Sequence, residues 1–184
     1  MLLAAGSGRR YGQPKALVDT GSGPWVLGAL EALRCCDPRL VVVGAGGADV
    51  AALLPADVLV VGNPGHAEGM GSSLRLGLQA LAGAAPGSDA AVVLLVDLPG
   101  VGVAVTERLV RAAGPPASAR TALLRAAFDG SPGHPVLLGR AHWPGVIASA
   151  VGETGARGYF RQHPPRLVEC ADIGSGEDVD VPPG

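Results

Sequence analysis

The chain has 184 residues, a formal net charge of −2 at pH 7, and a composition that is 48% hydrophobic but only 3% aromatic. This size predicts a single domain over residues 1–184, with alanine, valine and leucine filling the core. The small negative charge argues against nucleic acid or an anionic membrane surface as a partner, because both attract strongly basic proteins.

Strand-like and helix-like segments alternate through the first 113 residues. Strands are expected at 2–5, 40–43, 58–61 and 91–96, and helices at 24–34, 48–54, 72–81 and 103–113. Such alternation predicts a parallel sheet covered by helices on both faces. Ligands of these sheets bind outside the carboxyl ends of the strands, where Gly6, Asn63 and Asp97 each follow an expected strand.

The rest of the chain predicts a hairpin and further helices. We expect a loop at 115–118, a hairpin of strands 121–128 and 135–138, helices at 141–150 and 155–162, and a last strand at 167–171. The longest apolar run, 90–96, is far too short to cross a bilayer. No signal-peptide pattern is visible, and three cysteines without C-x-x-C spacing predict free thiols. These features predict a cytoplasmic protein with no membrane partner.

A glycine-rich turn leads from the first strand to the only lysine of the chain, Lys15. Gly6 and Gly8 lack a Cβ, so the backbone can turn sharply and bring its N–H groups to an anion. Arg10 offers a planar guanidinium to phosphate oxygens, and Lys15, expected to be exposed, offers a mobile point charge. These residues indicate a polyphosphate site.

Two other phosphate-binding motifs do not fit this turn. Ala16 stands where a P-loop needs serine or threonine after its lysine. A dinucleotide fingerprint needs glycine or alanine at its third position, where the two candidate turns carry Tyr11 and Asp49.

The segment from Leu3 to Leu17 resembles the L-A-A-G-x-G-x-R-x-G-x-P-K-x-L signature of MobA-like nucleotidyltransferases and matches every fixed position. These enzymes join a nucleoside triphosphate to a phosphorylated acceptor and release pyrophosphate. The resemblance implies a Rossmann-like three-layer α/β/α sandwich of the nucleotide-diphospho-sugar transferase type, with Lys15 and Arg10 as catalytic residues. Relatives usually have a longer lead-in before the first strand, so either this strand is short or residues are missing from the chain.

The resemblance extends to a second segment on the nucleotide side. Residues 69–78, G-M-G-S-S-L-R-L-G-L, are similar to the family loop that lines the base pocket, and Ser72 is also expected to cap the helix that follows. The nucleotide-binding residues implied by the two segments are Ala4, Ala5, Gly6, Gly8, Asn63, Gly71, Ser72 and Ser73.

Two carboxylates are candidate ligands for Mg²⁺. Asp97 follows a buried strand, and Mg²⁺ is usually held by one or two carboxylates together with phosphate oxygens. Its segment resembles the family's G-D-x-P motif, with Val96 in place of glycine. Asp180 lies in a segment that resembles D-I-D-T-P, whose second aspartate is the second metal ligand in relatives. A turn aspartate and a solvated acidic tail are the structural alternatives.

Two further motifs resemble those of the acceptor side. Gly133-His134-Pro135 resembles G-H-P, and residues 152–157, G-E-T-G-A-R, resemble G-D-x-G-A-R with Glu153 in place of aspartate. They imply that His134 and Arg157 bind the phosphorylated acceptor, although a structural histidine and a surface ion pair are the alternatives. We assign no role to the other three histidines, His66, His142 and His163.

Together these motifs resemble the branch that contains molybdopterin cytidylyltransferases. Relatives with L-A-A-G use pyrimidine nucleotides more than those with L-A-G-G, so Ala5 favours CTP as the donor. The alternatives are a transferase acting on a sugar or alditol phosphate, an oxidoreductase of the nicotine blue oxidoreductase type, and a catalytically silent nucleotide-binding protein.

Overall fold

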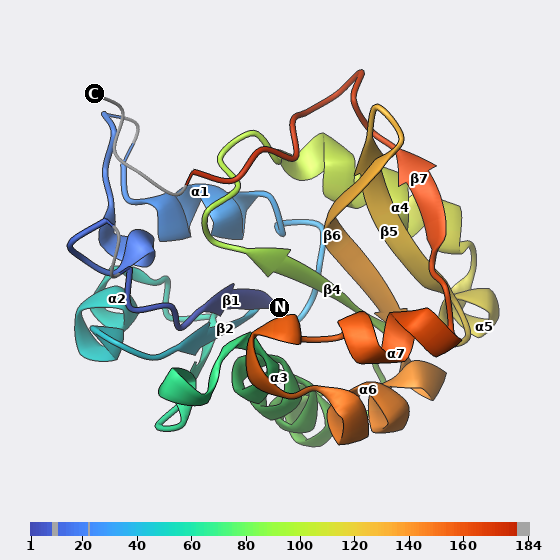
Figure 1. Cartoon of the computed structure of the whole chain (residues 1–184), viewed down its shortest axis with the longest axis horizontal. Helices are drawn as coiled ribbons and strands as arrows, with labels where there is room; N and C mark the ends of the chain where they lie inside the picture. Colours follow the sequence, from blue (N-terminus) through green and yellow to red (C-terminus); the bar gives the residue numbers. More distant parts are fainter. Residues whose placement is uncertain (9–10, 22, 180–184) are drawn as a thin grey trace.

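The computed structural model describes residues 1–8, 11–21 and 23–179, which form a seven-stranded sheet between helices (Figure 1). The strands are β1 (Leu2–Ala4), β2 (Leu40–Val43), β3 (Leu59–Gly62), β4 (Ala90–Leu95), β5 (Leu123–Phe128), β6 (Ser131–Gly139) and β7 (Arg166–Glu169). The α-helices are α1 (Trp25–Glu31), α2 (Gly47–Leu53), α3 (Met70–Ala84), α4 (Val103–Ala113), α5 (Pro116–Ala119), α6 (Trp143–Ser149) and α7 (Arg157–Gln162). Short 3₁₀ turns are η1 (Lys15–Leu17), η2 (His66–Glu68), η3 (Arg140–His142) and η4 (Gly152–Thr154).

The strand order is β3-β2-β1-β4-β6-β5-β7, and β6 alone runs against its neighbours in this described sheet. The mostly parallel sheet expected from the sequence is therefore confirmed. The reversal at β6 comes from the expected hairpin. Asp129 and Gly130 have positive φ values of 50° and 77°, the conformation that a two-residue Asp-Gly turn adopts between antiparallel strands.

Two hydrophobic clusters cover the two faces of the sheet. Alternate strand residues point to opposite faces, so that Leu2 enters one cluster and Leu3 the other. Helices α1, α2 and α4 pack on the face of Leu2, and α3, α6 and α7 pack on the face of Leu3 (Figure 1). A fully buried leucine such as Leu2 or Leu78 contributes about 1.5–3 kcal/mol relative to an exposed one. This is the three-layer α/β/α sandwich that the sequence predicted.

Two expectations about individual elements are wrong. Residues 116–119 form the short helix α5 where a loop was expected, since Pro116 lies at a helix start, where proline's fixed φ is compatible with helical backbone. The third helix begins at Met70, not at Ser72, so Ser72 lies in its first turn and does not cap it. Gly69 precedes the helix with a φ of 106°, and a Cβ there would lie 2.5 Å from the backbone of Gly152. The other boundaries differ from the expected ones by a few residues.

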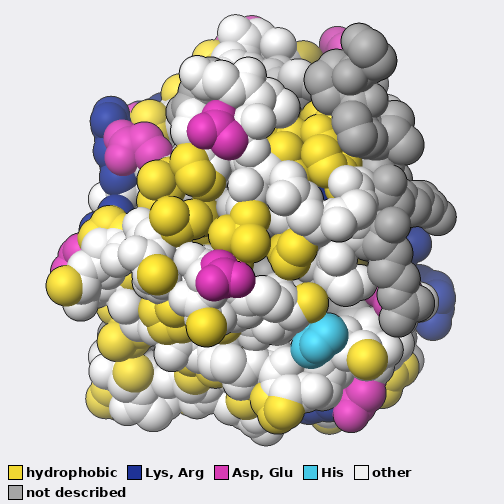
Figure 2. Space-filling view, turned by 90° about the vertical axis from the view of Figure 1, so that its left-hand side faces the viewer, with side chains coloured by type: hydrophobic (Ala, Val, Ile, Leu, Met, Phe, Trp, Pro, Cys, Tyr) yellow, Lys and Arg dark blue, Asp and Glu magenta, His cyan; other side chains and the backbone are white. Residues whose placement is uncertain are grey.

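Figure 2 looks onto the side of the molecule formed by α2 and the β3 edge. Hydrophobic side chains lie here among polar ones. Leu53 of α2 and Leu59 and Val60 of β3 are exposed. Described lysine and arginine side chains appear only toward the margins of this view. Within the described ranges, no helix is both long enough and apolar enough to cross a membrane.

Candidate active site

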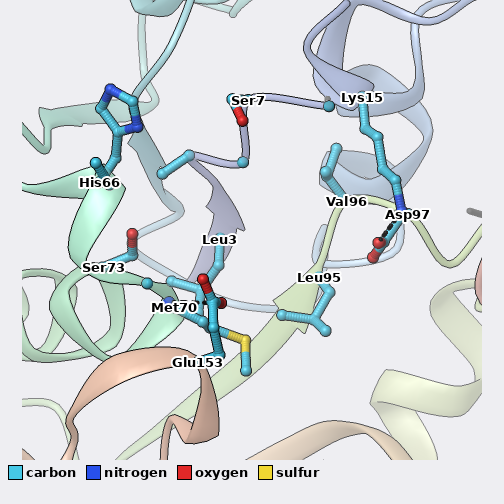
Figure 3. Close-up of a pocket in the computed structure, with 15 residues that line it drawn as sticks. Leu3, Ser7, Lys15, His66, Met70, Ser73, Leu95, Val96, Asp97 and Glu153 are labelled. Atoms are coloured by element: carbon cyan, nitrogen blue, oxygen red, sulfur yellow. Dashed lines mark hydrogen bonds and ion pairs between the residues drawn. The ribbon is translucent and has the colours of Figure 1, made fainter. Parts of the chain in front are cut away.

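A cavity of about 410 Å³ opens where the loops after β1 and β4 separate (Figure 3). The chain builds β1, β2 and β3 toward one edge of the sheet and then adds β4 on the other side of β1. Open α/β sheets bind ligands at such a switch in strand order, because the two loops turn away from each other there. Residues from the loop after β1, from the end of β4, from η2 and from the start of α3 line the cavity.

The glycines of the turn after β1 have different reasons to be glycine. Gly8 has a φ of +60°, and a Cβ there would lie 1.7 Å from the carbonyl oxygen of Gln13. The carbonyl of Gly8 accepts the N–H groups of Tyr11 and Gly12, at 2.8 and 2.9 Å. A Cβ on Gly6 would meet no described atom within 4 Å. Gly8 is thus needed to form the turn, whereas Gly6 leaves space open in the cavity.

Lys15 and Asp97 form an ion pair in the wall of the cavity. Their Nζ and Oδ2 atoms are 2.8 Å apart, and their side chains are 15% and 21% exposed. Figure 3 shows the lysine reaching across the cavity wall to the aspartate at the end of β4. The expectation of an exposed Lys15 is therefore wrong, because η1 begins at this residue and its side chain turns toward β4.

Asn63 and the two serines form a buried hydrogen-bonded cluster beside the cavity. The Asn63 amide donates to the hydroxyls of Ser72 and Ser73, both at 2.9 Å, and its oxygen accepts the N–H of Gly65, also at 2.9 Å. Of these residues Ser73 lines the cavity, while Asn63 is only 6% exposed and fixes the loop between β3 and α3.

The other expected nucleotide-binding residues also fall into two groups, those that line the cavity and those that are packed behind it. Ala5 lines the cavity, whereas Ala4 is buried inside the sheet and Gly71 is packed against a neighbouring loop. A Cβ on Gly71 would lie 2.7 Å from the backbone nitrogen of Val151. The structure brings Ala5, Gly6, Gly8, Ser73, Lys15 and Asp97 together around the cavity.

His66 and Glu153 were not among the expected site residues, yet both line this cavity (Figure 3). Glu153 accepts a long hydrogen bond, 3.4 Å, from the N–H of Met70 at the start of α3, where a negative charge is favourable. Two signals were available. Glu153 lies within the G-E-T-G-A-R motif, and His66 belongs to the same loop as Asn63.

A second cavity, of about 120 Å³, shares Leu3, Met70 and Leu95 with the first and contains both expected acceptor residues, His134 and Arg157. Burial first, and then the nearby charges of Arg125 and Arg157, lower the pKa of His134 from 6.5 to about 4. The imidazole is therefore neutral at pH 7.

The sequence profile of the MobA-like NTP transferase domain matches residues 1–167. The chain belongs to the MobA-like NTP transferase family. It is 35% identical to the nicotine blue oxidoreductase of Paenarthrobacter nicotinovorans over 98% of the chain and 91% of that protein. The crystal structure of Rv0371c from Mycobacterium tuberculosis is similar with a TM-score of 0.77 and 25% identity, covering 98% of this chain and 90% of that one. A manganese complex of Rv0371c has a TM-score of 0.68 and 27% identity, with 98% and 88% covered.

The residues around the cavity of this MobA-like chain are compatible with a divalent cation bound together with phosphate. No group of three histidine, cysteine or carboxylate side chains that could hold a metal occurs in the described ranges. Mg²⁺ does not need one, since it is commonly held by one or two carboxylates plus substrate phosphates, and Asp97 offers one carboxylate at the cavity. The N–H of Val179 donates to the Asp97 carbonyl at 3.1 Å. Asp180 and Arg10 lie outside the described residues.

The lowered pKa of His134 predicts acid-sensitive stability for this MobA-like fold. The unfolded chain binds a proton at His134 near its ordinary pKa of 6.5, whereas the folded chain does so near 4, facing Arg125 and Arg157. The contribution of neutral His134 to the free energy of unfolding should therefore be fully present above pH 6.5. It should fall by on the order of 3 kcal/mol as the pH decreases toward 4. Urea unfolding of wild type and His134→Phe between pH 4 and 7 measures this loss.

The difference between the two unfolding curves is the informative quantity, because carboxylates elsewhere also titrate in this range. His134→Phe keeps a planar ring and should lose stability less steeply than wild type as the pH falls. His163→Phe, at a histidine stacked on Tyr159 at 4.2 Å, controls for the removal of a histidine ring. Parallel curves for wild type and His134→Phe would contradict the prediction.

Proposed function

We propose that this chain transfers CMP from CTP to a small phosphorylated acceptor, such as a molybdenum-cofactor pterin, and releases pyrophosphate. The observation that carries this proposal is the Lys15–Asp97 pair, which faces the Gly6–Gly8 turn across one cavity at the switch in strand order. A cation, a carboxylate and a turn with closely spaced backbone N–H groups are what a bound nucleoside triphosphate with its metal requires. We also propose that the chain acts as one cytoplasmic domain, without nucleic acid or membrane as a partner.

On the donor side, the backbone N–H groups of the turn would hold the phosphates. Arg10 would add a bidentate contact, and Lys15 would exchange its contact with Asp97 for phosphate oxygens when the nucleotide enters. The base would lie against Ala5 and Ser73, which line the same cavity. Asn63 and Ser72 would support this loop from behind through their hydrogen bonds.

Asp97, together with Asp180, would hold Mg²⁺, which when bound neutralises charge on the triphosphate. The carboxylate of Asp97 lines the cavity and accepts a hydrogen bond from Lys15, which orients it. Divalent metal binding by a relative is consistent with this role, since Rv0371c forms a manganese complex.

The proposed reaction is an in-line displacement at the α-phosphorus. An oxygen of the acceptor phosphate forms a bond to that phosphorus, while the bond to the bridging oxygen breaks and pyrophosphate leaves with the electron pair. No protein nucleophile takes part. The chain contributes by positioning the two phosphates and by stabilising the negative charge that develops, through Lys15, Arg10 and the turn.

The proposal is tested by two measurements on the purified chain. Thermal shifts with each nucleoside triphosphate, with and without Mg²⁺, report binding, because a ligand at a hundred times its Kd adds about 2.7 kcal/mol to stability. Pyrophosphate release is then measured with CTP and competing acceptors: a molybdenum-cofactor pterin, sugar phosphates and alditol phosphates. Release with a sugar or alditol phosphate alone would replace the pterin by that acceptor class. Failure of every triphosphate to bind would refute a nucleotidyltransferase.

Base selection gives a sharper prediction. Ala5 is 6% exposed at the cavity, and a buried methyl group resists overlap with a larger base by about 1–3 kcal/mol. Wild type should therefore prefer CTP to GTP by roughly tenfold or more in kcat/KM. Ala5→Gly should reduce that ratio by making room for the purine. Ala45→Gly, at an alanine outside the cavity, is the matched control, and a wild-type preference for GTP would refute the pyrimidine assignment alone.

A second candidate function is an oxidoreductase reaction, favoured by the 35% identity to nicotine blue oxidoreductase. The two turns that could hold a dinucleotide lack the third small residue of the fingerprint. Oxidation of NADH or NADPH by the chain, with a quinonoid dye as acceptor, would support this candidate, and inertness toward both reductants would remove it.

A further inference from the structure

The second cavity has an apolar interior of defined size. Strands β1, β4 and β6 contribute Leu3, Leu95 and Val136, while α3 and α7 contribute Leu74 and Phe160. Its volume of about 120 Å³ is slightly smaller than that of an apolar cavity of about 150 Å³, which accepts one benzene ring. The cavity is therefore close in size to a site for one ring and too small for a fused system of several rings.

Two arginines stand at this cavity without a carboxylate. Arg125, from β5, donates through Nε to the Gly133 carbonyl at 2.8 Å and through Nη2 to the Pro132 carbonyl at 3.2 Å, so the hairpin fixes its guanidinium. Arg157 begins α7 on the other side. No aspartate or glutamate lines the cavity in the described part of the chain.

The two positive charges also act on each other. Both line the same cavity. Burial first, and then the charge of Arg157, lower the pKa of Arg125. No ion pair joins either group to a carboxylate of the described residues. Arg125 is half-buried and Arg157 is exposed at the rim of the cavity. An anion bound between the two guanidinium groups would relieve their repulsion, and guanidinium groups suit phosphate oxygens in particular.

We propose that this cavity selects the acceptor: it takes one apolar ring of a phosphomonoester, while Arg125 and Arg157 hold the anionic group and His134 offers a hydrogen bond. The assignment rests on the proposed function for its connection to the nucleotide cavity, with which it shares three lining residues. It adds Arg125 as a specificity residue and limits the inserted part of the acceptor to one ring. An acceptor with fused rings would keep the others outside.

The size of the cavity is tested with three probes whose Kd values are measured by ligand-observed NMR: phenyl phosphate, inorganic phosphate and phenol. Phenyl phosphate should bind at least about tenfold more tightly than inorganic phosphate or phenol. It alone both buries a ring in the cavity and places a phosphate group on the two arginines. Ala156→Leu fills the cavity and should weaken phenyl phosphate by about tenfold while leaving inorganic phosphate unchanged. Ala148→Leu, at an exposed alanine of α6, should change neither.

The charge requirement is tested on α7. Arg157→Gln should weaken both anionic probes by about tenfold and leave phenol unchanged. Arg161→Gln, an exposed arginine of the same helix outside the cavity, is the matched control. The inference is overturned if phenyl phosphate binds no better than inorganic phosphate, or if Ala156→Leu and Arg157→Gln both bind it as wild type does.

These outcomes are separable from the fate of the proposed function, because no probe contains a nucleotide. If phenyl phosphate binds as expected while no triphosphate binds, the proposed function fails and the cavity assignment stands. If CTP is transferred while phenyl phosphate fails to bind, only the cavity assignment fails.

Discussion

Replacing Lys15 by alanine is expected to lower kcat/KM for nucleotidyl transfer by about a hundredfold, a loss of roughly 3 kcal/mol of transition-state stabilisation. The reason is that the charge of Lys15 stands in the wall of the cavity, 2.8 Å from Asp97, where it would compensate the charge developing on the phosphates. Steady-state rates of pyrophosphate release from CTP measure this loss. Because the lysine is 15% exposed and paired, its removal should also cost about 1 kcal/mol of folding stability.

Two comparisons make the Lys15 result interpretable. Arg34→Ala removes an exposed basic residue that pairs with Glu31, and its turnover should equal that of wild type. Urea unfolding of Lys15→Ala shows whether the fold survives, so that lost turnover is not lost protein. If Lys15→Ala turns over within about twofold of wild type, the lysine has no part in the reaction.

Asp97→Asn is expected to abolish metal-dependent transfer, with kcat/KM falling by at least about a hundredfold. The substitution keeps the shape of the side chain but removes the negative charge that a hard cation requires. It also leaves Lys15 facing a neutral amide, although the amide oxygen can still accept a hydrogen bond. The measurement is the dependence of the transfer rate on Mg²⁺ concentration, for wild type and variant at saturating CTP.

The matched control for Asp97→Asn is Asp57→Asn, because Asp57 also pairs with a basic residue, Arg39, but lies at the surface away from the cavity. Its Mg²⁺ dependence should match that of wild type. Asp180→Asn should act in the same direction as Asp97→Asn. An unchanged Mg²⁺ dependence in Asp97→Asn would place the metal elsewhere.

The fold could be predicted largely from local patterns. Continuous apolar runs such as 91–96 mark strands buried on both faces, and Asp129-Gly130 marks the turn that reverses β6. The helix α5 escaped prediction because its short Pro116–Ala119 segment has no amphipathic period to detect. The start of α3 depended on a contact between Gly69 and Gly152, which are far apart in the sequence.

The candidate site was less predictable than the fold, because it depends on more contacts between residues that are far apart in the sequence. Gly8, Lys15 and Asp97 stood out because each follows a strand or turn with a chemical signature of its own. The inward position of Asn63 was not visible, since it depends on Ser72 and Ser73 approaching from another element. Arg125 gave no signal either, because its proximity to Arg157 arises only when β5 and α7 meet at one cavity.

The single lysine of the chain makes its proposed catalytic group spectroscopically isolated. Protein grown with isotope-labelled lysine would give one set of side-chain NMR signals, and these would need no assignment. The chemical shifts of that ammonium group and its exchange with water would report the contact with Asp97 in solution. Adding CTP would then show, in the same spectrum, whether the ammonium changes partner before any chemistry occurs.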